Sequence, residues 1–514
     1  MITLIHPPGL KAVGSLQINV PNPPLGLAYI AAVLKEAEKP YCVIDATGEA
    51  LDTVRPYTLR DDFVVQGLTI DAIIERIPEA TTVVGIGCMF SSSWPITRLV
   101  AENVRARFTD ALIVAGGEHI TALPEFILGD SPVDVAVLGE GEETFLALLD
   151  AWDTGQPLAD VPGLAFRHEG RVINTGLSPR TRHIDSIPLP DWDSFPIEEY
   201  ISRHQSNGPN LGRSMPILTT RGCPYRCTFC SNDNMWTTRY VQHSPKRVVD
   251  EMALYAHKYH VTNFDCQDLT AIVKRSWSIQ LCKELIARGL NITWQMPTGT
   301  RSEVFDDEVV DLLYQSGCRL LSFAPESGSP EILRDVKKQI DLENLFKSIR
   351  RALRAGFKVS CFIVIGFPTE RPDTLKVTMR LIRKFAVMGV HDITVSKFVP
   401  YPGSVMFREL LAEGKVQLND EFFFSPMDLY TKNSPSYADA VSLKFLYRTM
   451  LLMFFNFYII SFLLRPFRVI RVLWRAITTG VEETKYAKWF IYQFYSRRKW
   501  RQSLATSPSD GVSS

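Results

Sequence analysis

Short nonpolar runs alternate with helical patterns along the first 150 residues. The runs are almost continuously nonpolar, as is typical of parallel strands that helices cover on both faces. Between the first two runs, residues 25–38 repeat nonpolar side chains at helical spacing. Five strands are predicted, at Ile2–His6, Tyr41–Asp45, 82–88, 111–115 and 134–138. This pattern predicts an α/β fold that begins with a doubly wound domain of the flavodoxin-like (Rossmann-like) type.

A second alternation of strands and helices extends from Pro216 to about Tyr401. Six strands are predicted, at 216–220, 262–266, 291–295, 318–323, Lys358–Ile365 and 392–398. Six β/α units are fewer than the eight of a complete barrel. The pattern therefore predicts a partial (β/α)6 barrel of the TIM type, with its site at the C-terminal ends of the strands.

Shifts in composition mark the predicted boundaries. Residues 154–215 are rich in Pro, Gly and Asp, which predicts a linker with short pieces of sheet. The chain becomes helical after Ser404, and its last residues are rich in Ser, Thr and Pro, which predicts disorder. The predicted division is 1–153 for the first domain, 154–215 for the linker, 216–404 for the barrel, 405–501 for a helical region and 502–514 for a tail.

The composition excludes several classes of protein. With 514 residues, of which 46% are hydrophobic, the chain can bury about three domain cores, so a disordered or fibrous protein is excluded. Equal numbers of basic and acidic residues, 56 of each, leave no net charge, so we expect no nucleic-acid partner. The residues after Met1 lack the pattern of a signal peptide, and nine cysteines do not indicate a disulfide scaffold in so long a chain. We expect a cytoplasmic protein.

Three cysteines lie at C-x-x-x-C-x-x-C spacing directly after the first predicted barrel strand: Cys223, Cys227 and Cys230. This spacing lets one short loop point three thiolates at one centre. A cubane iron–sulfur cluster offers four iron corners, so three thiolates leave one iron open to another ligand. The alternatives are a zinc site or structural thiols. Zinc normally takes a fourth protein ligand near at hand, and His243 is far along the chain.

This motif resembles that of radical S-adenosylmethionine (SAM) enzymes. The resemblance implies that the three cysteines hold a [4Fe–4S] cluster whose fourth iron binds SAM. Several later segments match that family at the ends of successive strands, including Pro400–Ser404, which is similar to the P-x-P-G-[ST] motif of its cobalamin-containing branch. The SAM-binding residues that the resemblance implies are Phe229, Asp265, Asp268, Arg301, Glu326, Ser327, Gly328, Gly366 and Pro368.

Three loops at strand ends of the first domain resemble those of a cobalamin-binding domain. Glycines let the backbone approach a large ligand, and hydroxyl groups can bind a phosphate or an amide. The implied cobalamin-binding residues are Ser91, Ser92, Gly116, Gly117, His119, Thr121, Gly139, Glu140, Gly141 and Glu142.

The first domain departs from other cobalamin proteins in one respect. The D-x-H-x-x-G motif, whose histidine ligates cobalt, is absent, because Asp45 is followed by Ala, Thr and Gly48. The lower face of cobalt would then lack a histidine ligand. His6 and His119 could serve as ligands, although a lone histidine is more often structural. A domain that binds nothing, or another nucleotide, remains the alternative.

The resemblance implies a cobalamin-dependent radical SAM enzyme, and a methyltransferase acting on an unactivated carbon is the leading hypothesis. A second hypothesis is a cyclase of the oxygen-independent magnesium-protoporphyrin monomethyl ester type, without methyl transfer. A third is a non-catalytic corrinoid-binding protein. Either enzyme would need SAM, a small-molecule substrate and an external one-electron reductant of the flavodoxin or ferredoxin type.

The helical region contains an uncharged nonpolar run at 450–464, shorter than the roughly 20 residues that a spanning helix needs. Ten Lys and Arg against two Glu follow between Arg465 and Arg501. Two interpretations stay open: a helical cap over the barrel mouth, or such a cap with a peripheral membrane contact through 450–501. The nonpolar region also suggests a lipophilic substrate.

Overall fold

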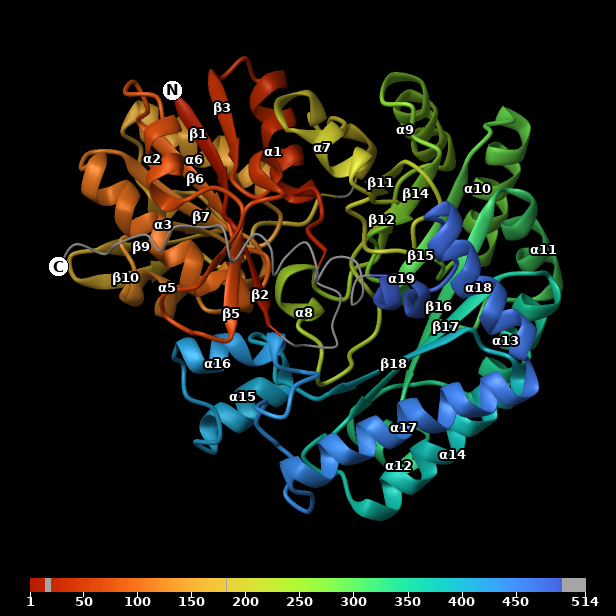
Figure 1. Ribbon diagram of the computed structural model, residues 1–514. Helices are drawn as coiled ribbons and strands as arrows, with labels where there is room; N and C mark the ends of the chain where they lie inside the picture. The colour runs from red at the N-terminus through yellow and green to blue at the C-terminus, as the bar shows by residue number, and fades with distance from the viewer. Residues whose placement is uncertain (14–19, 182, 492–514) are drawn as a thin grey trace.

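The computed structural model describes residues 1–13, 20–181 and 183–491. The chain forms two α/β units side by side, and its C-terminal helices pack mainly around the second (Figure 1). Each unit is built on a largely parallel sheet. The predicted fold class, a doubly wound domain followed by a partial barrel and a helical region, is therefore confirmed.

Seven strands form the first sheet, in the order β10-β9-β8-β7-β6-β1-β3. Five are parallel: β1 (Ile2–His6), β3 (Tyr41–Asp45), β6 (Val83–Gly87), β7 (Leu112–Gly116) and β8 (Val135–Val137). Numbered along the chain, the parallel strands lie in the order 2-1-3-4-5, which is the flavodoxin-like order. The winding direction therefore switches between β1 and β6, where such domains bind their ligands.

Helices cover both faces of this sheet. On one face lie α1 (Leu25–Glu36) and α6 (Gly141–Thr154), whose buried residues join one core cluster. The other face packs against α2 (Ile70–Arg76), α3 (Trp94–Arg107) and α5 (Pro124–Asp130). Because both faces are covered, the parallel strands are nonpolar throughout, as the sequence pattern predicted.

Two parts of the fold go beyond the prediction. The segment predicted as a linker with short pieces of sheet contains β9 (Leu164–His168) and β10 (Arg171–Asn174), an antiparallel hairpin that extends the first sheet beyond β8. The hairpin covers an edge that the short β8 would otherwise leave open. A separate antiparallel sheet contains β2 (Gly9–Ala12), β5 (Phe63–Gln66) and β4 (Val54–Pro56). Strands of three or four residues are too short to show a clear period.

The second sheet has six parallel strands in chain order, as an open barrel requires. The strands are β11 (Ser214–Ile217), β14 (Asn263–Cys266), β15 (Thr293–Thr300), β16 (Cys318–Glu326), β17 (Lys358–Ile365) and β18 (Asp392–Lys397). β15 and β16 extend beyond their predicted ends through irregular register, which periodicity does not reveal.

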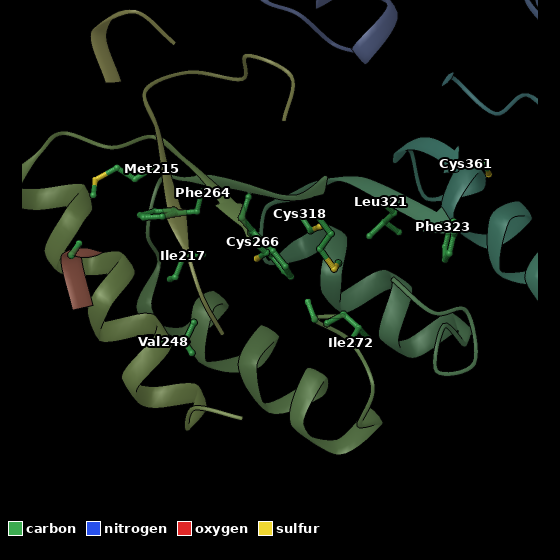
Figure 2. Close-up of a cluster of buried hydrophobic side chains, with 14 of the residues drawn as sticks. Met215, Ile217, Val248, Phe264, Cys266, Ile272, Cys318, Leu321, Phe323 and Cys361 are labelled. Atoms are coloured by element: carbon green, nitrogen blue, oxygen red, sulfur yellow. The ribbon is translucent and has the colours of Figure 1, made fainter. Parts of the chain in front are cut away.

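Helices surround the outside of the barrel sheet. They are α9 (Pro245–Lys258), α10 (Arg275–Arg288), α11 (Asp307–Gln315), α12 (Pro330–Asp335), α13 (Leu342–Arg354) and α14 (Pro372–Met388). Figure 2 shows nonpolar side chains of neighbouring strands, among them Phe264, Cys266 and Cys318, in the core beside these helices. Cys266, Cys318 and Cys361 are fully buried and serve as small core residues.

The C-terminal helices form two groups. α15 (Val405–Ala412) and α16 (Asp420–Phe424) pack against the first unit, where the ring of Phe423 lies 5.2 Å from that of His119. α17 (Leu443–Leu464) runs beside α14 and β18, and is followed by α18 (Pro466–Thr479) and α19 (Lys485–Ile491). α17 is the one helix among the described residues that is long and apolar enough to cross a membrane, by length and composition alone.

The expected cap over the barrel mouth is not formed by these helices. Glu483, after α18, pairs with Lys358 at the start of β17, and Arg468 of α18 donates to the carbonyl oxygen of Gly389 just before β18. These contacts lie at the N-terminal ends of the strands, opposite the mouth. α18 and α19 therefore cover the bottom of the barrel. α17 runs along its side and begins at the mouth edge, where Leu446 lies against Gly366 at the end of β17. The mouth itself faces the first unit.

Candidate active site

The loop with the three motif cysteines leaves the C-terminal edge of the barrel sheet. β11 ends at Ile217, and β12 (Thr220–Arg221) pairs with β13 (Val241–Gln242), which holds the chain just before the loop. Gly222 has φ of 83°, and a side chain there would overlap the carbonyl oxygen of Arg239. Glycine therefore permits the turn that starts the cysteine loop.

All three cysteines of this loop are free thiols, and Cys230 is the most accessible of them. The N–H of Cys230 donates to the carbonyl oxygen of Cys227 at 3.1 Å, which closes a turn between the two residues. The surrounding protein nevertheless desolvates the thiols: it raises the pKa of Cys230 to about 12, and raises the pKa of Cys223 and Cys227 as well. Cys230 is therefore exposed as a residue, while its thiol group is desolvated by the protein around it.

Two cations beside the cysteine loop oppose this effect of burial. Lys338 and Arg301 both act to lower the pKa of Cys223 and Cys227. The Nζ of Lys338 lies 2.9 Å from a carboxylate oxygen of Glu326, and the guanidinium of Arg301 lies 3.8 Å from the ring centroid of Tyr225. Two positive charges therefore lie beside the thiols, where they would stabilise the thiolate form that binds a metal cluster.

Among the described residues, no three Cys, His, Asp or Glu side chains converge closely enough to hold a single metal ion. A zinc site would collect about four ligands around one atom. His243, the nearest downstream histidine, is buried with its Nδ1 2.9 Å from a carboxylate oxygen of Asp185. A cubane cluster presents a different iron to each thiolate, so its ligands can stand farther apart.

Two other predicted barrel residues also lie by the cysteine loop. Glu326 ends β16 with φ of 65° and pairs with Lys338, which interacts electrostatically with Cys227. A positive φ is uncommon for a residue with a side chain, and strained residues of this kind tend to cluster at functional sites. The ring of Phe229, inside the loop, lies 5.5 Å from that of Phe367, which follows β17.

Asp265 and Asp268 are placed differently from the sequence expectation. Asp265 accepts hydrogen bonds from the N–H of Gly208 and from the side chains of Asn263 and Gln295 in the barrel interior. Its carboxylate is fully engaged away from the cysteine loop, so the geometry assigns it a structural role. Asp268 accepts from Thr219 and Thr220, which positions the strand that leads into the loop.

The remaining predicted SAM-binding residues at strand ends also form hydrogen bonds within the protein. The hydroxyl of Ser327 lies 3.0 Å from that of Thr378 on α14, which also accepts from the N–H of Gly328. Gly366, with φ of 88°, donates its N–H to Glu370, and the carbonyl oxygen of Pro368 accepts from the N–H of Asp439. These contacts anchor the ends of β16 and β17.

In the first unit, the loops after β6, β7 and β8 are fastened to one another. Thr121 donates its hydroxyl to the carbonyl oxygen of Gly117 and accepts from the N–H of Gly139. Gly117 has φ of 124°, and a side chain there would overlap the carbonyl of Cys88. Next to Ser91 and Ser92, the side chain of Phe90 is 69% exposed although it lies at the switch-point edge.

The two candidate histidine ligands are both held by the protein. His119, of α4 (Glu118–Ala122), is fully buried between the rings of Trp94 and Phe423, and its Nδ1 lies 2.9 Å from the hydroxyl of Ser91. Burial lowers its pKa to about 3, so the ring is neutral. Its contacts indicate a packing role, contrary to the expected cofactor contact. The Nδ1 of His6 lies 2.7 Å from Asp45.

The two units meet through a buried cluster of charges. Arg221, which precedes the cysteine loop, pairs with Glu140 at 3.0 Å and with Glu142 at 2.6 Å, and Arg180 also pairs with Glu140 at 3.0 Å. Both carboxylates were expected to bind a cofactor. The structure instead uses them to fasten the first unit to the base of the cysteine loop, next to the backbone of Gly141.

A second contact lies closer to the thiols. Glu118, directly after Gly117, lies close enough to Ser231, the residue that follows Cys230, for that side chain to lower its pKa. Burial raises the pKa of Glu118 to about 7. α4 also packs against α8 (Asn232–Met235), which lies between the two sheets (Figure 1). The switch-point edge of the first unit therefore faces the cysteine loop.

Two family models match the chain in the same arrangement. The model of the radical SAM superfamily matches residues 217–382, and the model of the B12 binding domain matches residues 13–149. The first match contains all three thiols and the second contains the switch-point loops.

The chain carries a radical SAM domain and a B12 binding domain.

Relatives extend over most of this radical SAM chain. An uncharacterised methyltransferase of Pyrococcus horikoshii is 28% identical over 80% of the chain and 83% of its own length. An anaerobic magnesium-protoporphyrin IX monomethyl ester cyclase of Rubrivivax gelatinosus is 27% identical over 77% and 68%. The structure of the radical SAM methyltransferase TsrM from Kitasatospora setae, with cobalamin and a [4Fe–4S] cluster bound, superimposes with a TM-score of 0.63 at 19% identity, covering 80% of this chain and 78% of TsrM.

The described residues fit the cofactors of this radical SAM fold. Three free thiols on one loop, with two cations beside them, suit a [4Fe–4S] cluster. At the facing edge, the exposed side chains of Met89 and Phe90 and the closely approaching backbone of Gly117 suit a broad, largely nonpolar ligand such as a corrin.

Several site residues were missed by sequence reasoning. Lys338 follows α12, in no recognisable motif, and reaches the thiols only through tertiary folding. Glu118 adjoins the Gly116-Gly117 pair, which was the available signal. Tyr401 lies in the recognised Pro400–Ser404 segment; burial raises its pKa, and the nearby Cys230 adds to that effect.

Proposed function

We propose that the chain is a cobalamin-dependent radical SAM methyltransferase that acts on an unactivated carbon of a small substrate. The observation that carries this proposal is the placement of three free thiols at the barrel mouth, facing the switch-point edge of the B12 binding domain. When bound, the cluster supplies an electron for SAM cleavage to a 5′-deoxyadenosyl radical, and the corrinoid supplies a methyl group.

The chain's own residues bind, orient and shield these groups. Cys223, Cys227 and Cys230 hold the cluster, and Phe229 borders the SAM site. Lys338 and Arg301 offset the charge of the thiolates, while Glu326 keeps Lys338 in place. The first unit closes the mouth and excludes water from the reacting groups. We further propose 1–153, 154–215, 216–404 and 405–501 as the working divisions of the chain, with β9 and β10 of the second division completing the sheet of the first. The tail at 502–514 lies outside the described residues.

Product analysis after incubation with SAM and a one-electron reductant tests the function. The methyltransferase is expected to form deoxyadenosine together with S-adenosylhomocysteine. Deoxyadenosine without S-adenosylhomocysteine would favour a cyclase, which the similarity to the Rubrivivax enzyme supports as the second candidate. A protein that binds cobalamin but forms neither product would be a non-catalytic corrinoid-binding protein, and the proposal would then be wrong.

Cobalamin binding can be tested separately. Protein reconstituted with hydroxocobalamin is expected to keep a corrinoid absorption band through gel filtration. Gly117→Ala should lose this band, because alanine is strained by about 1–3 kcal/mol in this conformation and would displace the loop after β6. Gly129→Ala is the matched control, since its added methyl group meets no neighbouring atom. A wild-type protein that lacks the corrinoid band but keeps its iron–sulfur absorption would contradict the assignment.

We also propose a lipophilic substrate, a flavodoxin- or ferredoxin-type reductant and a cytoplasmic enzyme with peripheral membrane contact. A nonpolar side chain on the barrel edge supports the first of these: Leu269, which follows β14, is 47% exposed. Side chains of this kind are buried by a nonpolar ligand at little desolvation cost.

A further inference from the structure

The outward face of α17 is nonpolar, the reverse of what water favours. One stripe of the helix is buried against the protein: Leu446, Met450, Met453, Phe457 and Ser461. The opposite side exposes Leu452 (54%), Phe455 (62%), Phe462 (48%) and Leu463 (70%). No charged residue stands between Arg448 and Arg465, so 16 residues, or roughly 24 Å of helix, present only nonpolar and uncharged polar groups.

The same surface continues onto α18. Phe467 is 84% exposed, and Ile470 (55%), Trp474 (66%) and Ile477 (48%) follow it at helical spacing. Val472 and Ala476 form the buried side of this helix. A cavity of about 350 Å³ opens between the two helices, and its lining includes Phe454, Phe455, Tyr458, Phe462 and Arg468. Such a lining suits an acyl chain better than a polar ligand.

A line of basic residues borders this nonpolar surface on α14. Lys376, Arg380 and Arg383 are exposed and recur at helical spacing. The Nε of Arg383 donates to the side-chain oxygen of Asn456 at 2.9 Å, which shows that this line runs beside α17. Lys444 and Arg448 add two exposed cations near the start of α17. Residues 374–391 and 440–481 contain no Asp or Glu at all.

The arginines counted in the sequence are largely engaged elsewhere. Arg465 donates to the carbonyl oxygens of Ala386 and Val387, and Arg468 donates to those of Gly389 and Val390, so both satisfy the C-terminal end of α14. Arg475 pairs with Glu483. Lys488 is buried and donates to backbone carbonyl oxygens. Arg497, Arg498, Lys499 and Arg501 lie outside the described residues.

We propose that the α14–α17–α18 face is a docking surface for a bilayer that contains anionic phospholipids. Exposed aromatic and aliphatic side chains would enter the headgroup boundary, while Lys376, Arg380, Lys444 and Arg448 meet the phosphates. The buried stripe of α17 keeps that helix flat against the barrel, so the helix lies along the membrane. A second copy is a poor occupant, because a two-fold interface would bring two acid-free basic faces together.

This inference identifies the surface that would make the proposed peripheral membrane contact. It rests on that part of the proposed function alone. Vesicle binding needs neither SAM cleavage nor methyl transfer, so its failure leaves the enzymatic proposal standing.

Sedimentation with vesicles tests the surface on the full chain. Wild-type protein is expected to pellet with vesicles of phosphatidylcholine and phosphatidylglycerol at low salt, less at high salt, and little with phosphatidylcholine alone. A Phe467→Asp/Trp474→Asp variant should lose at least about tenfold in vesicle partition, and so should a Lys376→Glu/Arg380→Glu variant. All these side chains are exposed, so the fold should persist.

Matched substitutions on other helices provide the controls. Leu254→Asp/Ile286→Asp changes two exposed nonpolar residues of α9 and α10, and Lys283→Glu/Arg350→Glu reverses two exposed charges on α10 and α13. Both controls should bind vesicles like the wild type. Pelleting that is equal for all lipids and salts, absent altogether, or lost equally in the controls would overturn the proposal. A lipid-free dimer that Phe467→Asp/Trp474→Asp dissociates would instead assign the face to a second copy.

Discussion

Replacing Cys227 with alanine is expected to abolish iron–sulfur absorption and reduce deoxyadenosine formation to background. The variant removes one of three thiolates from a cluster that already leaves one iron to SAM, so the remaining two ligands cannot hold it. Cys223→Ala and Cys230→Ala should behave alike. Absorption near the iron–sulfur bands and chromatography of the nucleoside product measure the two effects.

The other cysteines supply the control. Cys282→Ala removes a thiol that is buried in α10, away from the loop, and should keep both the cluster and SAM cleavage. All cysteine variants should still retain cobalamin, because the switch-point loops lie in the first unit. An active Cys227→Ala protein that carries a full cluster would refute the site assignment.

Replacing Arg221 with methionine is expected to destabilise the junction of the two units by about 3–5 kcal/mol. Arg221 is 2% exposed and pairs with Glu140 and Glu142, so its loss leaves the buried Glu142 without a counter-charge. Urea unfolding measures the loss. A second substitution, Glu142→Gln, should recover much of it, because the uncompensated charge is then removed as well.

The pH dependence provides a further check on this junction. Burial raises the pKa of Glu140, but the hydrogen bonds and charges of Arg180 and Arg221 outweigh burial and lower it. A lowered pKa in the folded state contributes stability above the ordinary pKa of glutamate, and that contribution is lost as pH falls. Wild type and Arg221→Met should therefore converge in stability in acid.

Arg371→Met, which breaks an exposed pair with Glu331, should change the urea midpoint little. Equal losses in the two variants would contradict a special role for Arg221.

Features that depend on near neighbours in the chain were predictable. The nonpolar runs of β1, β3 and β17 were located to the residue, since parallel strands covered on both faces need continuous nonpolar sequence. The C-x-x-x-C-x-x-C spacing placed three thiols on one loop without any knowledge of the fold. By contrast, β2 and β4 were missed, and β9 was expected only as an unplaced piece of sheet, because pieces of three to five residues form strands only once a partner edge is present.

Long-range contacts could not be predicted in the same way. Glu140 and Glu142 looked like ligand-binding residues, and only the docking of the two units shows that they pair with Arg221, about 80 positions away. Asp265 follows the family pattern in sequence, yet the barrel interior satisfies its carboxylate with Gly208 and Gln295. A buried polar side chain must pair with another polar group, because burial removes it from water. The packing of the folded chain decides which partner it meets.

The sequence by itself determined the two alternating α/β units and the thiol loop between a strand and a helix, because local periodicity and spacing encode them. The tertiary structure decided which charged side chains are used within the protein and which are left to meet a ligand or a surface. Lys338 reaches the thiols from a distant segment, and Arg465 and Arg468 satisfy the carbonyl oxygens at the end of α14, while Lys376 and Arg380 of α14 line the nonpolar face of α17. The partner of each charged side chain is set by which groups lie near it in space. The sequence pattern shows only which residues lie near it along the chain.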